Sequence, residues 1–232
     1  MDFSIILPVY NEAGIIDNNL KNIFAYLDKK DFSWELIIVN DGSTDQTGEI
    51  INKFNRLRII ENKTNCGKGW SVRKGMLAAE GEKCLFLDAD LSTDISELDR
   101  FLPFIDENDI IIGTRQSLDT EILKSQPIYR VMLGRLGNFL IRVILNFKFK
   151  DTQCGFKLFD KKTRVIFEKQ TIKRWGFDFE LIILAQKMKF KIKEIGVRWQ
   201  DGESSKIKPI SYLNTLIELL KIKINLLTKK YG

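Results

Sequence analysis

The chain has 232 residues, of which 44% are hydrophobic, and this is enough apolar material for one domain with a substantial core. It carries 37 lysines and arginines against 31 aspartates and glutamates, and the net charge of +6 favours a phosphate-rich partner or an anionic surface. It contains no histidine, which excludes Ser-His-Asp and Cys-His triads and zinc sites with histidine ligands. The three cysteines are widely spaced, so neither a disulfide framework nor a thiolate metal site is predicted, and a reducing cytosolic setting is expected.

Neither a secretory signal nor a membrane-spanning segment is predicted. Met1 leads directly into the strand-like run 3–7, without a basic region or a small-residue cleavage site. The most apolar stretches, 139–147 and 213–227, are interrupted by charged residues and fall short of the roughly 20 apolar residues that a spanning helix needs.

The first half of the chain alternates short apolar runs with helical patterns, which is typical of a parallel sheet covered by helices. In chain order we predict a strand 4–9, a helix 13–29, a strand 35–39, a helix 45–54, a strand 57–61, a helix 69–79, a strand 83–87, a helix 95–105 and a strand 110–112. The sequence therefore predicts an α/β fold.

The alternation stops after residue 112, so the second half is predicted to form a different architectural layer. Its predicted elements are an amphipathic helix within 121–150, a short strand near 156–159, a helix around 177–189, a strand 192–199 and a terminal helix within 204–232. Only four prolines and no obvious hinge occur, which predicts a single domain over 1–232.

Two segments, 121–150 and 204–232, each carry six lysines or arginines against one glutamate. Each also carries an apolar stripe at helical spacing. The first stripe consists of Leu133, Leu136, Leu140, Val143 and Phe147, and the second of Leu213, Leu216, Ile217, Leu220, Ile224 and Leu227. Such a face either packs on the protein's own core or lies on a membrane surface, and the pattern leaves both interpretations open.

Polar clusters follow four consecutive predicted strands of the first half. These clusters are Pro8-Val9-Tyr10-Asn11-Glu12, Asn40-Asp41-Gly42-Ser43-Thr44-Asp45, Asn65-Cys66-Gly67-Lys68-Gly69 and Asp88-Ala89-Asp90-Leu91-Ser92. Because ligands of a parallel α/β sheet bind beyond the carboxyl ends of its strands, we expect the four clusters to converge on one crevice.

Each cluster alone also has a simpler explanation. Asp41-Gly42 is an ordinary turn, Ser43 could begin a capping box, and Asp94 with Glu97 could cap the following helix. Gly67-Lys68-Gly69 has neither the glycine spacing of a Walker loop nor that of a dinucleotide-binding loop.

The pair Asp88 and Asp90 carries the strongest chemical signal. Two carboxylates at one strand end repel each other, and both stay ionised most easily when a hard divalent cation lies between them and a phosphate ligand. The absence of histidine and of clustered cysteine predicts Mg²⁺ or Mn²⁺ with oxygen ligands. The alternative is a pair of helix-capping acids, and a phosphatase with an aspartate nucleophile fits less well because three strand-helix units precede the pair.

Together with Arg73 and Gly75, these clusters resemble those of the family 2 glycosyltransferases. Later motifs resemble the polyprenyl-phosphate branch of that family, and the dolichyl-phosphate β-glucosyltransferases most of all. They are Gly113-Thr114-Arg115, Asp151-Thr152-Gln153-Cys154-Gly155-Phe156-Lys157, Trp175-Gly176-Phe177-Asp178-Phe179-Glu180, and Val197-Arg198-Trp199 through to Gly202-Glu203-Ser204-Ser205-Lys206.

The resemblance covers nearly the whole chain and implies the GT-A fold, a Rossmann-like and mostly parallel sheet flanked by helices, here with peripheral amphipathic helices. It implies a nucleotide-sugar donor bound by residues 1–120, and inverting transfer to a polyprenyl phosphate, dolichyl or undecaprenyl, handled by residues 121–232. Ser92 stands where mannose-transferring relatives commonly carry glutamine, which favours UDP-glucose or another UDP-sugar. The eukaryotic relatives also carry an N-terminal membrane anchor that is not seen here, so we expect a peripheral protein on the cytosolic face of a membrane.

By the same resemblance, specific residues are assigned to the donor, the metal and the acceptor. The donor-binding residues are Pro8, Tyr10, Glu12, Asp41, Ser43, Gly67, Lys68, Asp88, Ala89 and Asp90. Asp88 and Asp90 would also hold Mg²⁺ or Mn²⁺ and act in catalysis, and Arg115 and Arg130 would face the acceptor phosphate. Either arginine could instead form a surface salt bridge or a solvated helix face.

The acceptor class decides whether a general base is needed. A phosphate monoester, with a second pKa of about 6, is already an anionic nucleophile at neutral pH. A sugar hydroxyl would need a carboxylate to take its proton, and Asp178 or Glu180 is the candidate. Other open alternatives are GDP-mannose as donor, and a non-catalytic protein that binds membrane surfaces. Nucleic acid is not expected, because the basic segments are aliphatic and lack stacking aromatic residues.

Overall fold

The computed structural model describes residues 1–124, 128–146, 148–201 and 209–231. These residues form one seven-stranded sheet with the strand order β3-β2-β1-β4-β7-β5-β8, and a two-stranded sheet of β6 and β9. The strands are β1 (Phe3–Val9), β2 (Trp34–Asn40), β3 (Leu57–Glu61), β4 (Lys83–Leu87), β5 (Ile110–Thr114), β6 (Glu121–Lys124), β7 (Phe156–Asp160), β8 (Ile192–Gly196) and β9 (Arg198–Gln200). Strand β7 runs antiparallel to both its neighbours, and the other pairings of the large sheet are parallel.

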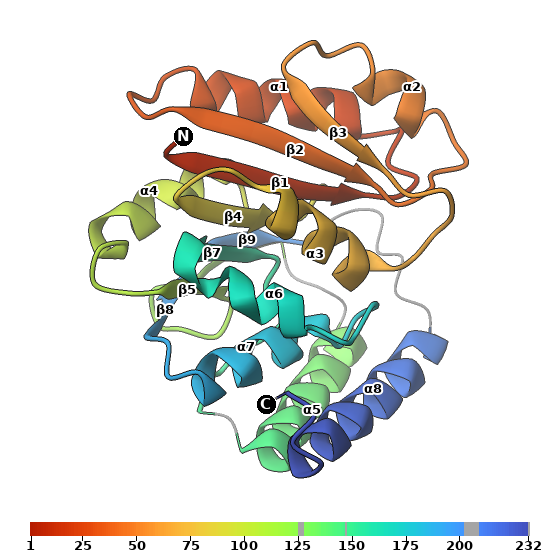
Figure 1. Ribbon diagram of the computed structural model, residues 1–232, viewed down its shortest axis with the longest axis vertical. Coiled ribbons are helices and arrows are strands. Elements are labelled where there is room, and N and C mark those ends of the chain that lie inside the picture. Colours follow the sequence, from red (N-terminus) through yellow and green to blue (C-terminus); the bar gives the residue numbers. More distant parts are fainter. Residues whose placement is uncertain (125–127, 147, 202–208, 232) are drawn as a thin grey trace.

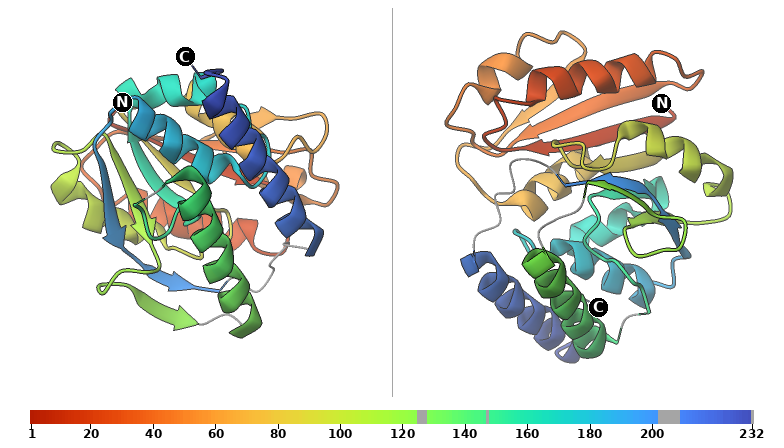
Figure 2. Two further views of the ribbon diagram at one scale, coloured as in Figure 1. Left: turned by 90° about the horizontal axis from the view of Figure 1, so that it is seen from below. Right: turned by 180° about the vertical axis from the view of Figure 1, so that it is seen from behind.

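Helices cover both faces of the large sheet, as Figures 1 and 2 show. The α-helices are α1 (Ile16–Leu27), α2 (Thr47–Ile51), α3 (Lys68–Ala78), α4 (Leu98–Phe101), α5 (Ile128–Leu145), α6 (Val165–Lys169), α7 (Phe177–Lys187) and α8 (Pro209–Leu227), and the 3-10 helices are η1 (Ile95–Glu97), η2 (Leu102–Phe104) and η3 (Lys161–Arg164). One core cluster joins the sheet to α3, α6 and α7 with α5 and α8, and the other joins it to α1, α2, η1 and α4. The predicted architecture of a mostly parallel sheet flanked by helices is confirmed.

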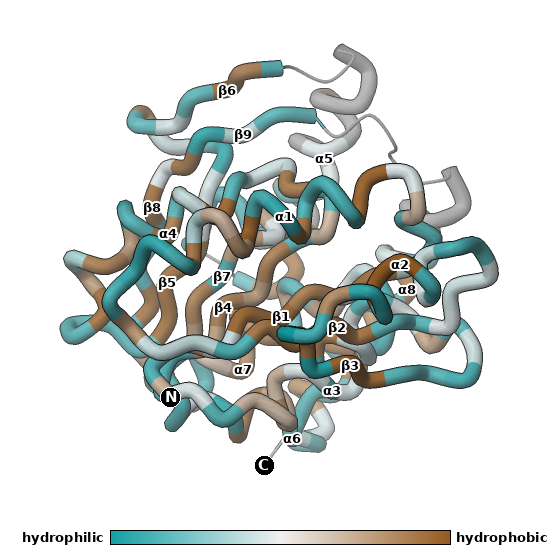
Figure 3. The backbone as a smooth tube through the Cα atoms, turned by 90° about the horizontal axis from the view of Figure 1, so that it is seen from above, coloured by the Kyte–Doolittle hydropathy of each residue, from teal (hydrophilic) through white to brown (hydrophobic). Residues whose placement is uncertain are grey.

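The central strands explain why the first half folds as predicted. All seven residues of β1 are buried, and they alternate between the two cores, with Ile6 in one and Ile5 and Leu7 in the other. A strand covered on both faces needs a continuous apolar run, which is what the sequence provides. Figure 3 shows β1, β2 and β4 as hydrophobic segments surrounded by hydrophilic loops.

Three predictions for the later elements are wrong. The second half is not a separate layer, because β7 inserts between β4 and β5 and β8 extends the same sheet. The helix predicted over 95–105 is broken into η1, α4 and η2, with Pro103 in the last piece, where a proline lacks the N–H that a continuing helix requires. The strand predicted over 192–199 ends at Gly196, after which Arg198 begins β9 and pairs with the unpredicted strand β6. The segment 161–169, which forms η3 and α6, was also not predicted as helical.

Helices α5 and α8 lie side by side at one end of the molecule (Figures 1 and 2). Helix α8 docks through Leu219, Ile222 and Asn225, which are at most 6% exposed. The predicted α8 stripe faces outward: Leu213, Leu216, Ile217, Leu220, Ile224 and Leu227 are all exposed, by 39% to 73%. In α5, Met132, Phe139 and Val143 are exposed as well, while Phe147 and the side chains of Leu133, Leu136 and Leu140 lie outside the described residues.

The α8 stripe is therefore not buried against the core that the described residues form. Among the described residues, no helix has both the length and the apolar character needed to cross a membrane.

Candidate active site

The four polar clusters lie together at the carboxyl ends of β1, β2, β3 and β4, joined by a continuous chain of contacts. The loop after β1 meets the loop after β2, where the Asn11 main-chain N–H donates to Ser43 Oγ at 3.0 Å. The loop after β2 meets the loop after β3, where the Gly67 N–H donates to the carboxylate of Asp41 at 2.9 Å. The convergence predicted from the strand order is confirmed.

Asp41 holds the glycine-lysine loop in shape. Its buried carboxylate accepts hydrogen bonds from the side chains of Asn62 and Asn65 and from the main-chain N–H groups of Cys66 and Gly67, at 2.7 to 3.1 Å. Gly67 has a φ of +103°, a conformation that favours glycine. Asp41 thus organises the loop that presents Lys68, a role that the prediction of direct nucleotide contact did not include.

The other predicted nucleotide-binding residues of the first two strands surround this loop system. Pro8 is buried near the end of β1, while Tyr10 and Glu12 follow it in a partly buried loop. The main-chain N–H of Glu12 donates to Thr47 Oγ1 at 2.8 Å, which fixes the loop to the start of α2. Ser43 does not cap α2, because its Oγ accepts the Asn11 bond instead.

Lys68 and Asp88 form an ion pair across the ends of β3 and β4, with 2.7 Å between Lys68 Nζ and Asp88 Oδ1. The same oxygen is buried and has no well-directed hydrogen bond from any described residue. Burial raises the pKa of Asp88, although Lys68 opposes this. Burial also acts to lower the pKa of Lys68, but the carboxylates of Asp88, Asp178 and Asp90 outweigh it and hold that pKa above its usual range. Among the described residues, Lys68 is therefore the polar partner of the buried Asp88 Oδ1.

Gly155 provides the space that the Asp88 carboxylate occupies. A Cβ atom built at Gly155 would overlap all three atoms of that carboxylate, and the Asp88 N–H also donates to the Gly155 carbonyl at 3.1 Å. Strand β7 thus begins directly against the acid pair. Gly155 belongs to the motif 151–157, whose sequence did not indicate this contact with Asp88.

Asp90 lies on a tight turn that follows β4. The Leu91 N–H donates to the Asp88 carbonyl at 3.1 Å, and the Ser92 N–H donates to Asp90 Oδ1 at 3.0 Å. Leu91 has a φ of +49°, which is uncommon for a large side chain. Asp90 is partly exposed, so one turn presents two carboxylates, with Ala89 buried between them.

These two carboxylates fit a hard divalent cation, because among the described residues the buried Asp88 Oδ1 makes an ion pair with Lys68 but no further hydrogen bond, and Asp90 is held at the edge of the site. No group of three or more acidic, cysteine or histidine side chains that could hold a metal occurs in the described part of the chain. Two protein carboxylates are the number with which Mg²⁺ is commonly bound when substrate phosphates supply further ligands.

Asp178 is buried at the start of α7, where it pairs with Lys157 of β7. Lys157 is fully buried, and its Nζ lies 2.5 Å from Asp178 Oδ1 and 2.5 Å from the Cys154 carbonyl. The Lys157 and Lys68 ammonium groups lie 5.6 and 5.4 Å from the centre of the Phe86 ring. Asp178, predicted as catalytic, is thus beside the site but paired with a lysine, which is the alternative that the sequence left open for these acids, although Lys157 was not identified as the partner.

Glu180, the other candidate base, is a structural anchor. Its fully buried carboxylate accepts hydrogen bonds from Thr171 N and Oγ1, from the Ile172 N–H and from the Tyr231 hydroxyl, the last at 2.6 Å. Burial, with the neighbouring Glu180 charge, raises the pKa of Tyr231. Glu180 therefore ties the end of the chain to α7.

Arg115 is placed at the end of β5 and is held by Asp151. Its Nε and Nη2 atoms donate to the two Asp151 oxygens at 2.6 and 3.0 Å. Burial opposes the Arg115 charge, but Asp151 outweighs it and raises the Arg115 pKa, with a smaller contribution from Asp88. The side chain of Arg130, predicted as its companion, lies outside the described residues, as does the segment 202–206.

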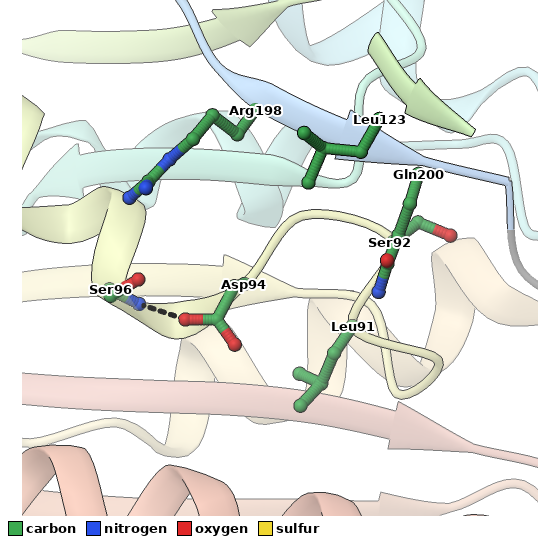
Figure 4. A pocket seen from close by; sticks show the side chains of 7 residues that line it. All are labelled: Leu91, Ser92, Asp94, Ser96, Leu123, Arg198 and Gln200. Carbon is green, nitrogen blue, oxygen red and sulfur yellow. Dashed lines mark hydrogen bonds between the residues drawn. The ribbon is translucent and has the colours of Figure 1, made fainter. Parts of the chain in front are cut away.

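A pocket of about 280 Å³ adjoins the turn that carries Asp90 (Figure 4). Its lining residues are Leu91, Ser92, Asp94, Ser96, Leu123, Arg198 and Gln200. Asp94 caps η1 by accepting from the Ser96 N–H at 2.9 Å, as the capping interpretation predicted. Glu97 is fully buried instead, where it accepts from Arg198 Nε at 2.5 Å. The pocket is therefore walled by the acid turn on one side and by β6 and β9 on the other.

Comparison with known proteins assigns this architecture to a family of enzymes. The family model described as glycosyl transferase family 2 matches residues 4–166. A dolichyl-phosphate beta-glucosyltransferase from Homo sapiens is 34% identical over 245 residues, which cover 97% of this chain and 76% of that protein. The proteins of that name from Drosophila melanogaster and Saccharomyces cerevisiae are 34% and 32% identical, and the matches cover 90% and 88% of this chain and 70% and 68% of those proteins.

Solved structures show the same fold at lower identity. Glucosyl-3-phosphoglycerate synthase from Mycobacterium tuberculosis, in complex with Mn²⁺, UDP and phosphoglyceric acid, superposes with a TM-score of 0.70 at 16% identity, covering 96% of this chain and 78% of that one. TarS 1-349 from S. aureus, in complex with UDP-GlcNAc, superposes with a TM-score of 0.62 at 22% identity, covering 97% and 67%.

Proposed function

Because the chain belongs to glycosyl transferase family 2, and its relatives include dolichyl-phosphate beta-glucosyltransferases, we propose that it transfers glucose from UDP-glucose to a polyprenyl phosphate. The observation that carries the proposal is that both candidate bases, Asp178 and Glu180, are already engaged by other groups of the protein. A family member that uses a hydroxyl acceptor needs a carboxylate to take the proton.

Neither Asp178 nor Glu180 is suited to that task. A proton on Asp178 would break its contact with Lys157, whose ammonium is fully buried and has Asp178 as its ion-pair partner. A proton on Glu180 would disturb a carboxylate that already accepts from four donors. An acceptor that arrives as an anion needs no base, and a phosphate meets this condition at neutral pH.

The proposed reaction is a single displacement. An oxygen of the acceptor phosphate forms a bond to the anomeric carbon of glucose, the bond from that carbon to the diphosphate oxygen breaks, and UDP leaves with the electron pair. Lys68 is proposed to stabilise the charge that develops on the leaving diphosphate. Arg115, which Asp151 holds at the end of β5, is proposed to bind the acceptor phosphate.

Asp88 and Asp90 are the proposed ligands of Mg²⁺ or Mn²⁺. When bound, such an ion supplies further neutralisation of the leaving diphosphate. The fit rests on the Asp88 carboxylate, whose buried Oδ1 contacts Lys68, and on the turn that fixes Asp90. The neighbouring fold that was solved with Mn²⁺ and UDP supports this choice of cofactor and of nucleotide.

The exposed face of α5 and α8 is proposed to rest on the cytosolic surface of a membrane, where the lipid acceptor would lie. Exposed cations flank it, among them Arg142 of α5 and Lys221 of α8. An exposed apolar stripe bordered by lysines and arginines is the pattern of an interfacial helix on anionic lipid. Partition of both the enzyme and its acceptor to one surface would explain why the described part of the chain leaves the stripe exposed.

The donor and metal are tested with radiolabelled UDP-glucose, other UDP-sugars and GDP-mannose, each offered with polyprenyl phosphate in the presence and absence of Mn²⁺. We expect metal-dependent transfer of label from UDP-glucose into the lipid phase, and its loss in Asp90→Ala. Asp17→Ala, which removes an exposed carboxylate of α1, is the matched control and should retain activity. Preferred transfer from GDP-mannose, or metal-independent transfer, would contradict the corresponding part of the proposal.

A further inference from the structure

Three segments that are distant in sequence meet around Arg115. They are the end of β5, the loop 151–155 before β7, and the segment 196–199 between β8 and β9. A Cβ atom at Gly113 would lie 3.1 Å from both Cys154 Sγ and a Val197 methyl group, so the three backbones approach closely. This close packing fixes the frame in which the Arg115 side chain is held.

The guanidinium of Arg115 is constrained on two sides. Asp151 accepts from its Nε and Nη2 atoms, and also from the Arg115 main-chain N–H at 3.0 Å. The guanidinium carbon lies 5.5 Å from the centre of the Trp199 ring, which is within the range of a cation–π contact. Because Asp151 engages the edge formed by Nε and Nη2, the Nη1 end of the planar group points away from Asp151.

The same chemical arrangement occurs a second time, far from the site. Arg56 donates from two nitrogens to Asp28 and lies 4.6 Å from the ring centre of Trp34, at the opposite end of the sheet. That pair is about half exposed, as is usual for a surface salt bridge of small energetic value. Asp151, in contrast, is fully buried, while Arg115 keeps 27% of its side chain exposed.

The difference in burial indicates that the Arg56 pair is a surface contact, whereas the Asp151 carboxylate fixes the position of Arg115. Burying a carboxylate costs free energy, and a well-packed apolar pair would stabilise the fold at least as well. The arrangement at Arg115 keeps the cation at the site edge and removes its freedom to rotate. Preorganisation of this kind lowers the cost of ordering a side chain when it binds an anion.

We propose that Asp151 and Trp199 are positioning residues that hold Arg115 with its Nη1 end directed to the acceptor phosphate. The inference rests on the proposed acceptor class. Trp199 acts through Arg115 and not through the sugar donor, so its loss should weaken acceptor binding and leave donor binding intact.

The test measures steady-state transfer from UDP-glucose to farnesyl phosphate, a short acceptor that does not require a membrane. For Trp199→Leu we expect KM for farnesyl phosphate to rise about tenfold, with kcat changed by less than about threefold. The Kd for UDP with Mn²⁺, measured by calorimetry, should stay unchanged. Trp199→Phe keeps an aromatic face and should restore most of the affinity for farnesyl phosphate. Trp34→Leu is the matched control, and it should leave the KM for farnesyl phosphate and the KM for UDP-glucose unchanged.

Several outcomes would overturn the inference. A Trp199→Leu enzyme with wild-type KM for farnesyl phosphate, or with equal losses in acceptor and UDP binding, would show that the ring only supports the fold. If Trp199→Leu does not fold, Trp199→Met keeps a large apolar side chain, and the same rise in KM is expected of it. A wild-type enzyme that binds UDP but transfers nothing to any lipid phosphate would refute the proposed function itself, which the wild-type assay alone reveals.

Discussion

The ion pair between Lys157 and Asp178 allows a quantitative test of how the site is built. Lys157 is fully buried and the Asp178 side chain is 6% exposed, so neither charge can be hydrated if its partner is removed. Breaking a buried pair on one side typically costs about 3–5 kcal/mol. We expect Lys157→Met to lower the free energy of unfolding by about that amount, which for a domain of this size lowers Tm by roughly 6–20 °C.

The double variant Lys157→Met/Asp178→Asn separates this charge effect from lost packing. It removes both formal charges, so it should be more stable than the sum of the two single losses predicts, with a coupling energy of at least about 2 kcal/mol. The assay is urea-induced unfolding of the four proteins, followed by circular dichroism. Additive losses, within about 0.5 kcal/mol, would refute the claim that Asp178 is held as a buried partner of Lys157.

Three further predictions concern other parts of the structure. Gly155→Ala should lower transfer by about 100-fold, because the new Cβ displaces the Asp88 carboxylate, and the loss is measured in the UDP-glucose assay. Burial raises the pKa of Glu218 above 4.5, so its contribution to stability is complete below that value and is lost as the pH rises through the folded-state pKa. The difference between the Tm of the wild type and the Tm of Glu218→Gln should therefore become smaller or more negative as the pH is raised from about 4 to 7. Ile224→Lys, on the exposed stripe, should reduce sedimentation with anionic vesicles roughly tenfold.

Each of these predictions has a control and a contradicting outcome. Gly134→Ala adds a methyl group that would meet no described residue beyond its own turn of α5 within 4 Å, and should not reduce transfer. Equal activity of the two glycine variants would contradict the role of Gly155. A Tm difference at Glu218 that rises with pH would reverse the assigned sign. Leu77→Lys, on the exposed part of α3, should leave vesicle binding unchanged, and equal losses for it and Ile224→Lys would argue against a specific membrane face.

The first half of the fold could be predicted from the sequence because its determinants are local. Strands buried on both faces appear as continuous apolar runs, and the polar residues that follow them must meet at one edge of a parallel sheet. The loops after β1, β2 and β3 do meet at this edge, through the hydrogen bonds from Asn11 to Ser43 and from Gly67 to Asp41. Sequence patterns therefore located the candidate site before any contact was known.

The rest of the site depends on long-range pairing that leaves no local signal. Strand β7 inserts antiparallel between β4 and β5, which brings Lys157 opposite Phe86 and Gly155 against Asp88. A lysine in an apolar run gives no indication that it will be buried as the ion-pair partner of a carboxylate 21 positions later. The exposure of the α8 stripe was also undecided, because amphipathic spacing is the same whether the apolar face meets a core or a lipid surface.

The proposed function depends on a phosphate acceptor. The most direct test supplies radiolabelled UDP-glucose and Mn²⁺, and compares a polyprenyl phosphate with the polyprenol of equal chain length as acceptors. We expect transfer to the phosphate and none above background to the alcohol, because Asp178 and Glu180, the two candidate bases, are already engaged by other groups of the protein. Comparable transfer to both acceptors, or transfer to the alcohol alone, would contradict it.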